Sequence, residues 1–190
     1  SVFIQYRKKK EGTLEELPQK NVDFGGGLER ILAACDNDPD VFKTDVFDKI
    51  IQEIEKNTDR SYGDKRNTTH MRVIADHLKA SVFLIKDGVI PSNKEQGYVL
   101  RRLLRRCAVK MYQLGGGLTP NFDRICDQGV LETYDGTYGF ERNIQRETLF
   151  SVINDELKRF ASSLEKGLKL FEKAKSIDGK VAFDLYQSYG

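Results

Sequence analysis

Three consecutive glycines, Gly25 to Gly27, stand between a strand-like segment and the start of an amphipathic helix. Residues 19–24 have the pattern of a short strand, and residues 28–34 that of a helix. Because glycine has no side chain, the backbone can take φ > 0 and a ligand can lie directly against it. The sequence therefore predicts a strand, a glycine turn and a helix in succession.

Charged residues flank this turn on both sides. Arg30 falls in the first turn of the predicted helix, where free backbone N–H groups and the helix dipole favour an anion. Its guanidinium suits a phosphate or the face of a base. Asp23, just before the glycines, offers a carboxylate to an ammonium group. The alternative is a flexible turn before an ordinary helix, with Asp23 accepting local backbone N–H groups.

Most of the remaining chain has the periodicity of helices. A strand is expected at residues 2–6, and helices at residues 45–54, 69–86, 98–114 and 181–189. Residues 143–174 are expected to form one long helix or a broken pair. The first of these helices has one apolar stripe, made of Val46, Phe47, Ile50, Ile51 and Ile54. The predicted fold is mainly α: a short strand–turn–helix piece, then helices that share one core because none is stable alone.

Composition narrows the class of protein. Of the 190 residues, 39% are hydrophobic and 32% charged, as in globular proteins, and the formal charge of +2 does not by itself indicate nucleic acid. No run of residues is apolar enough for a membrane span. Three widely spaced cysteines argue against a disulfide framework and favour a cytoplasmic protein. His70 and His77 lie about 10 Å apart along a helix, too far for one metal, so we expect no metal site.

Four arginines follow helical spacing in the predicted helix at residues 98–114. Arg101, Arg102, Arg105 and Arg106 occupy positions i, i+1, i+4 and i+5, which places them in one stripe opposite three leucines. The helix contains no acidic residue beside them, which favours contact with nucleic-acid phosphates. The alternative is an exposed face whose arginines pair with acidic residues of a neighbouring helix.

Several segments together resemble one known family. Residues 21–31 are similar to motif 3 of class II aminoacyl-tRNA synthetases, and more narrowly to that of alanyl-tRNA synthetases. Four further blocks follow in the family's order and at about its spacing, at residues 72–77, 87–93, 97–106 and 185–190. The resemblance implies that residues 1–38 are the C-terminal part of a catalytic domain and residues 39–190 a helical tRNA-recognition domain. It also implies that the chain is a piece of a longer protein.

The resemblance implies a reaction as well. The longer protein would activate alanine with ATP and Mg²⁺ and transfer it to tRNA(Ala). Zinc would belong to an editing domain, whose HxxxH and CxxxH pairs this chain lacks. Because the regions that would carry motifs 1 and 2 are also missing, we expect the chain alone not to aminoacylate. The alternative is a stand-alone RNA-binding module or a paralogue without aminoacylation activity. Nothing in the sequence indicates an oligomeric state.

Individual residues take family roles by position. Asp23 matches the aspartate that contacts the amino group of alanine, and Arg30 matches the motif 3 arginine that binds ATP. Gly25 and Gly27 match the glycines that leave room for the amino acid and the adenylate.

Two further positions match residues that read the tRNA. Asn93 matches the asparagine that recognises the G·U wobble pair of the acceptor stem, although an asparagine in a loop ordinarily serves its own turn. Gln187 stands where the family commonly has an acidic residue, the second reader of that pair. An amide still accepts a hydrogen bond from a guanine amino group, but without the charge.

Overall fold

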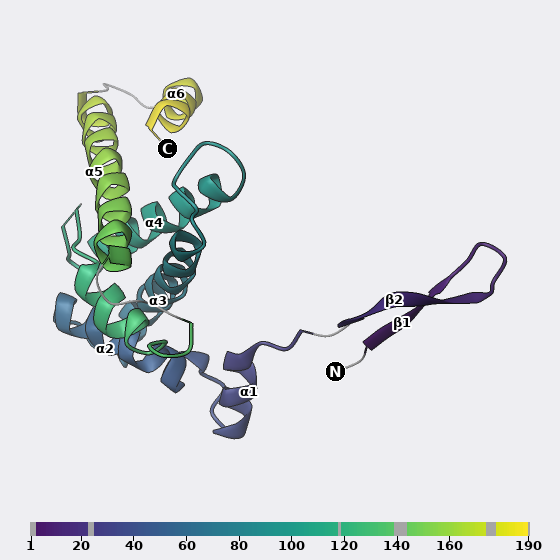
Figure 1. The fold of residues 1–190 in the computed structure, drawn as a ribbon. Coiled ribbons are helices and arrows are strands. Elements are labelled where there is room, and N and C mark those ends of the chain that lie inside the picture. The colour runs from purple at the N-terminus through teal and green to yellow at the C-terminus, as the bar shows by residue number, and fades with distance from the viewer. Residues whose placement is uncertain (1–2, 23–24, 118, 139–143, 174–177, 190) are drawn as a thin grey trace. The chain divides into compact units, whose positions relative to one another are not determined.

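The computed structural model describes residues 3–22, 25–117, 119–138, 144–173 and 178–189 (Figure 1). The chain forms two compact units, residues 1–44 and residues 45–190. Within the described residues the structure is mainly helical, with one two-stranded sheet. The predicted fold class, a short strand–turn–helix piece followed by helices, is confirmed.

The first unit begins with an antiparallel hairpin of β1 (Phe3–Lys8) and β2 (Leu14–Val22). The charged turn between them closes through a 2.8 Å hydrogen bond from Lys9 N to Thr13 O. The second strand begins at Leu14 instead of the predicted residue 19. The strand can include Pro18, which has no N–H to donate, because the register shifts there and interrupts regular pairing between the strands.

Two helical elements complete this unit. The predicted helix after the glycines is confirmed as α1 (Leu28–Cys35). A short 3₁₀ turn, η1 (Val41–Lys43), follows, and the Asp40 carboxylate caps it by accepting a 3.2 Å hydrogen bond from Phe42 N. Leu28 and Ile31 of α1 are each 54% exposed, so the described residues of this unit leave much of the apolar surface of the helix uncovered.

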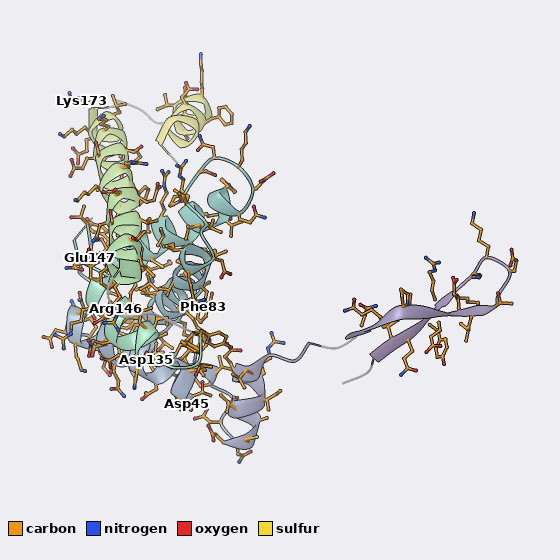
Figure 2. All side chains as sticks on the ribbon, in the orientation of Figure 1. Asp45, Phe83, Asp135, Arg146, Glu147 and Lys173 are labelled. Carbon is orange, nitrogen blue, oxygen red and sulfur yellow. The ribbon has the colours of Figure 1, made fainter. Side chains whose placement is uncertain are left out.

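The second unit is built from five α-helices and one π-helix among its described residues (Figure 1). They are α2 (Asp45–Thr58), α3 (Lys65–Lys86), α4 (Glu95–Gln113), η2 (Ile125–Leu131), α5 (Ile144–Lys173) and α6 (Gly179–Tyr189). All five residues of the predicted apolar stripe of α2 are buried. The predicted long helix is unbroken, with Arg146 and Glu147 labelled near one end and Lys173 at the other (Figure 2).

Three helices begin earlier than their periodicity predicted: α6 by two residues, at Gly179, and α3 and α4 by about one turn. Helix α3 starts at Lys65 instead of residue 69, because the Asp64 carboxylate accepts a 3.0 Å hydrogen bond from Arg66 N and caps the helix. Helix α4 starts at Glu95 instead of residue 98. Both extra turns are polar, so the apolar stripe from which the helices were predicted does not extend into them. The predicted stop at Asp87–Gly88 is confirmed, with φ +85° at Gly88.

The π-helix η2 was not predicted. Its widened turn is marked by a 3.0 Å hydrogen bond from Glu132 N to Asp127 O, five residues back. Gly129 lies against α2 so closely that a Cβ there would stand 2.9 Å from the Ile50 Cα. Just before η2, Arg124 Nε donates to Glu53 Oε2 of α2 at 2.9 Å. The bulged segment is therefore fastened to α2 by both packing and charge.

Candidate functional site

The glycine turn leads directly into helix α1. Gly27 is the N-cap residue, and its carbonyl accepts hydrogen bonds from Arg30 N and Ile31 N, both at 3.1 Å. The Arg30 side chain is exposed and turns back beside Gly27, where a Cβ would lie 3.6 Å from the Arg30 Cδ. The turn and Arg30 are thus brought together at the helix N-terminus, the place where backbone N–H groups favour an anion.

The glycines achieve this without left-handed backbone at Gly27. That residue has φ −75° and ψ 117°, an extended conformation open to any amino acid, so the chain does not use the freedom of glycine to take φ > 0 at this position. A Cβ at Gly25 would meet nothing within 4 Å. Among the described residues, no contact therefore requires glycine at position 25. Asp23 lies outside the described residues.

A second candidate site lies in the loop between α3 and α4. Asn93 is exposed, and its Oδ1 accepts a hydrogen bond from Arg101 Nη1 of α4. Arg101 Nη2 also donates to the Pro91 carbonyl at 3.5 Å. Because a guanidinium only donates, the amide oxygen of Asn93 must face Arg101. The NH₂ group of the amide is therefore directed away from Arg101 and is the part of this side chain suited to donate to a ligand.

The backbone of this loop is folded tightly onto the start of α4. Ser92 N donates to the Gly97 carbonyl at 3.0 Å, and Ser92 Oγ donates to the Lys94 carbonyl at 3.0 Å. A Cβ at Gly97 would stand 2.5 Å from the Ile90 carbonyl oxygen and closer still to Ser92 Oγ. Only glycine fits this approach of loop and helix. Gly97 therefore fixes the backbone that carries Asn93.

The four arginines of α4 do not form one exposed stripe. Arg101 and Arg105 are largely covered, with side chains 20% and 31% exposed, and both pair with Glu156 of α5. Arg102 and Arg106 are exposed. The alternative interpretation, in which the arginines pair with an acid of a neighbouring helix, thus holds for Arg101 and Arg105. Of the three leucines predicted opposite the stripe, Leu100 and Leu104 are fully buried and Leu103 is partly exposed.

Glu156 was not predicted as part of this site. Its side chain is 1% exposed, and its Oε1 lies 2.8 Å from Arg105 Nε and 3.3 Å from Arg101 Nε. The Arg105 guanidinium also lies over the Phe160 ring, 5.2 Å from its centroid. A signal was present, because Glu156 interrupts the buried apolar face of α5 beside Ile153 and Leu157. An acid on such a face requires a partner from another element.

The remaining predicted tRNA-binding residue, Gln187, falls within α6, but its side chain lies outside the described part of the chain.

Other titratable groups serve the fold. His77 Nδ1 lies 2.8 Å from Asp76 Oδ2, and this hydrogen bond holds the pKa of Asp76 below its usual value. Burial raises the pKa of the Cys107 and Cys126 thiols, which keeps them protonated and unreactive.

Neither a metal cluster nor a membrane helix is found in the described ranges. In these ranges, no group of three or more His, Cys, Asp or Glu side chains is placed so that it could hold a metal ion. None of the helices described above combines the length and the apolar character needed to cross a membrane.

The comparisons with known proteins place this chain in a family. The family model described as class II tRNA synthetases (A) matches residues 1–190. The chain therefore belongs to the class II tRNA synthetases of this type, and the resemblance seen in the sequence is confirmed.

Three similar curated proteins carry the name alanine–tRNA ligase. That of Thermotoga maritima is 42% identical over 195 residues, that of Christiangramia forsetii 39% over 196, and that of Fusobacterium nucleatum 36% over 200. Each match covers 100% of this chain but only 22–23% of the relative. The chain thus spans about a fifth of the length of the relatives it matches.

Proposed function

We propose that this chain is part of an alanine–tRNA ligase, which activates alanine with ATP and transfers it to tRNA(Ala). In this proposal residues 45–190 bind the acceptor stem of the tRNA, and residues 1–44 supply motif 3 to the catalytic domain. The observation that carries the proposal is the Asn93 amide, held by Arg101 at the surface and directed outward at the start of a helix with exposed arginines. The names and 36–42% identities of the relatives support it.

The proposed RNA interface combines one base-reading group with phosphate-binding groups. Asn93 would approach the wide, shallow minor groove of the acceptor stem, where a G·U wobble pair changes the pattern of donors and acceptors. Its outward NH₂ group would donate to an acceptor in that groove. The exposed Arg102 and Arg106 would bind phosphates and set the position of the stem. Arg101 and Arg105 pair with Glu156, so only their remaining N–H groups would be available to donate hydrogen bonds to the RNA.

The first unit would contribute to the adenylate site of the longer protein. Arg30, at the N-terminus of α1, would bind ATP. Mg²⁺ would be the counterion of the ATP phosphates. Gly25 and Gly27 would leave room for alanine and the adenylate, and Asp23 would hold the ammonium group of alanine. Exposed apolar residues on the hairpin and α1 support this assignment, because they would pack against the rest of a catalytic domain: Ile4, Tyr6, Leu14, Leu28 and Ile31.

Gln187 would be the second reader of the wobble pair. As a neutral amide it would accept a hydrogen bond from the guanine amino group without the charge assistance that a carboxylate provides. We therefore propose that Asn93 carries a larger share of the discrimination in this protein than in relatives with an acid at this position.

Titration with an acceptor-stem minihelix at about 50 and 200 mM salt tests the RNA-binding assignment. We expect the wild-type chain to bind, with affinity falling as salt rises. The double change Arg102→Ala and Arg106→Ala should weaken binding and flatten the dependence of log Kd on log salt by about 0.7–0.9 for each phosphate that is no longer neutralised. Absence of binding at the lower salt, or an unchanged slope in the double variant, would contradict this assignment.

A further inference from the structure

A buried carboxylate on one helix is linked to an exposed amide on a distant loop through a single arginine. Glu156 of α5 is 1% exposed, and its Oε1 pairs with Arg101 Nε of α4 at 3.3 Å. The same guanidinium donates to Asn93 Oδ1 and to the Pro91 carbonyl. The Asn93 side chain and the loop backbone beside it are therefore held by the same group.

A second arginine also holds Glu156 in place. Arg105 Nε donates to the same oxygen at 2.8 Å, and its guanidinium lies over the Phe160 ring. The carboxylate thus lies between two cations one helical turn apart, with a hydrogen bond to Arg105 and an ion pair without hydrogen-bond geometry to Arg101. A buried acid in this position is costly unless both of its partners stay in place.

An exposed asparagine otherwise loses rotational freedom when it binds a ligand. Ordering one such side chain reduces affinity by roughly two- to tenfold. Because Arg101 already fixes the oxygen of the Asn93 amide, this side chain loses its rotational freedom when the protein folds and not when RNA binds.

We propose that Glu156 and Arg101 are positioning residues for Asn93: Glu156 anchors Arg101, and Arg101 orients the amide with its NH₂ group outward. This inference rests on the proposed function for its purpose, since the amide is oriented for RNA. Its geometric part does not depend on RNA. Arg101 and Arg105, two of the four arginines predicted to bind phosphate, thereby help to position the side chain that reads the base pair.

Two conservative variants test the link, each with a matched control. Arg101→Lys keeps the charge but removes the planar fork that reaches both Glu156 and Asn93, and Glu156→Gln keeps the shape but removes the charge. Arg124→Lys and Glu53→Gln are the controls, because Arg124 Nε also pairs with a buried glutamate, Glu53, at 2.9 Å. That pair joins the segment before η2 to α2 and does not touch the Asn93 loop among the interactions described above.

The first readout is the order of the Asn93 side-chain amide in the free chain, measured by ¹⁵N relaxation. We expect an ordered amide in wild type and in both controls, and a mobile one in Arg101→Lys and Glu156→Gln. Thermal unfolding of each variant verifies that it is folded. An Asn93 amide equally ordered in all folded variants, or already mobile in wild type, would overturn the proposal.

The second readout is affinity for a G·U minihelix, measured for each variant with Asn93 and again combined with Asn93→Ala. Arg101→Lys and Glu156→Gln should each lower affinity about two- to tenfold in the Asn93 background and leave it nearly unchanged in Asn93→Ala. Equal decreases in both backgrounds would contradict the proposal, because the arginine would then act on RNA directly. If the amide is ordered through Arg101 but the chain shows no affinity for the minihelix, the positioning stands and the proposed function fails.

Discussion

At the scale of single residues, identical side chains in one helix do different work. Arg101 and Arg105 are turned into the protein by Glu156, whereas Arg102 and Arg106 face outward. Helical spacing places Arg101 and Arg105 in one row and Arg102 and Arg106 in another, about 100° around α4, but it does not say that an acid of another helix covers the first row. The difference comes from α5, which places a buried acid against half of that side.

Gly97 offers a test of how tightly the Asn93 loop must be held. A glycine-to-alanine change inside a helix ordinarily stabilises it by up to about 1 kcal/mol. Here the added Cβ would stand 2.5 Å from the Ile90 carbonyl oxygen, so the loop must move. We expect Gly97→Ala to lower the free energy of unfolding by about 1–3 kcal/mol and to weaken binding of a G·U minihelix. Urea denaturation and RNA titration measure the two effects.

Gly63→Ala is the matched control for this change. A Cβ at Gly63 would meet only Ser61 Oγ at 3.5 Å, an ordinary distance, so stability and RNA affinity should stay near those of wild type. A Gly97→Ala variant as stable as wild type, with unchanged RNA affinity, would show that the loop adapts and that its close approach is not needed.

At the scale of elements, the existence of helices was predictable and their first turns were not. The apolar residues at helical spacing that predict α2 are the same ones that are buried against the core, and this agreement locates the body of the helix. The starts of α3 and α4 depend on polar residues such as Asp64, whose capping role the periodicity does not report. The π-helix η2 has no period of its own and is held by α2, so only the packed structure reveals it.

The cap of α3 makes a prediction about pH. Hydrogen bonds from the Arg66 side chain and backbone hold the pKa of Asp64 at about 2, below its ordinary value of 3.8. Because the folded-state pKa is lowered, the stabilisation is fully present above about pH 4 and is lost as pH falls through about 2. We expect an NMR titration of the Asp64 carboxyl group to have its midpoint near 2.

Arg66→Ala should move this midpoint toward 3.8, and added salt should move it in the same direction, because the pair is exposed and screened. A wild-type midpoint at the ordinary value would show that Asp64 and Arg66 do not interact in solution.

At the scale of the whole molecule, the resemblance predicted a catalytic piece at residues 1–38 and a tRNA-recognition domain at residues 39–190, and these assignments stay predictions. The chain forms two compact units, with the boundary between Thr44 and Asp45. The family could be inferred from short blocks of sequence, because these blocks keep their order and spacing. The link from Glu156 to Asn93 could not, because it joins residues 63 positions apart on elements whose packing no local pattern reports.

The proposed division of work predicts what this chain cannot do alone. In the proposed function, the first unit would supply Arg30 and the glycine turn without the regions expected to carry motifs 1 and 2, so the adenylate site would be incomplete. We expect no formation of alanyl-tRNA when the chain is incubated with alanine, ATP, Mg²⁺ and tRNA(Ala). The relative from Thermotoga maritima serves as the positive control. Product above background from the chain alone would contradict this prediction.

In the proposed function, the helical unit reads a wobble pair through Asn93. The most direct test compares the Kd of the chain for two acceptor-stem minihelices that differ only in G·U against G·C, with wild type and Asn93→Ala. A discriminating hydrogen bond of about 1–3 kcal/mol predicts a preference of at least about fivefold for G·U, abolished in the variant. Equal affinity of the wild-type chain for both helices would contradict the claim and leave the exposed arginines as a binding surface for phosphates alone.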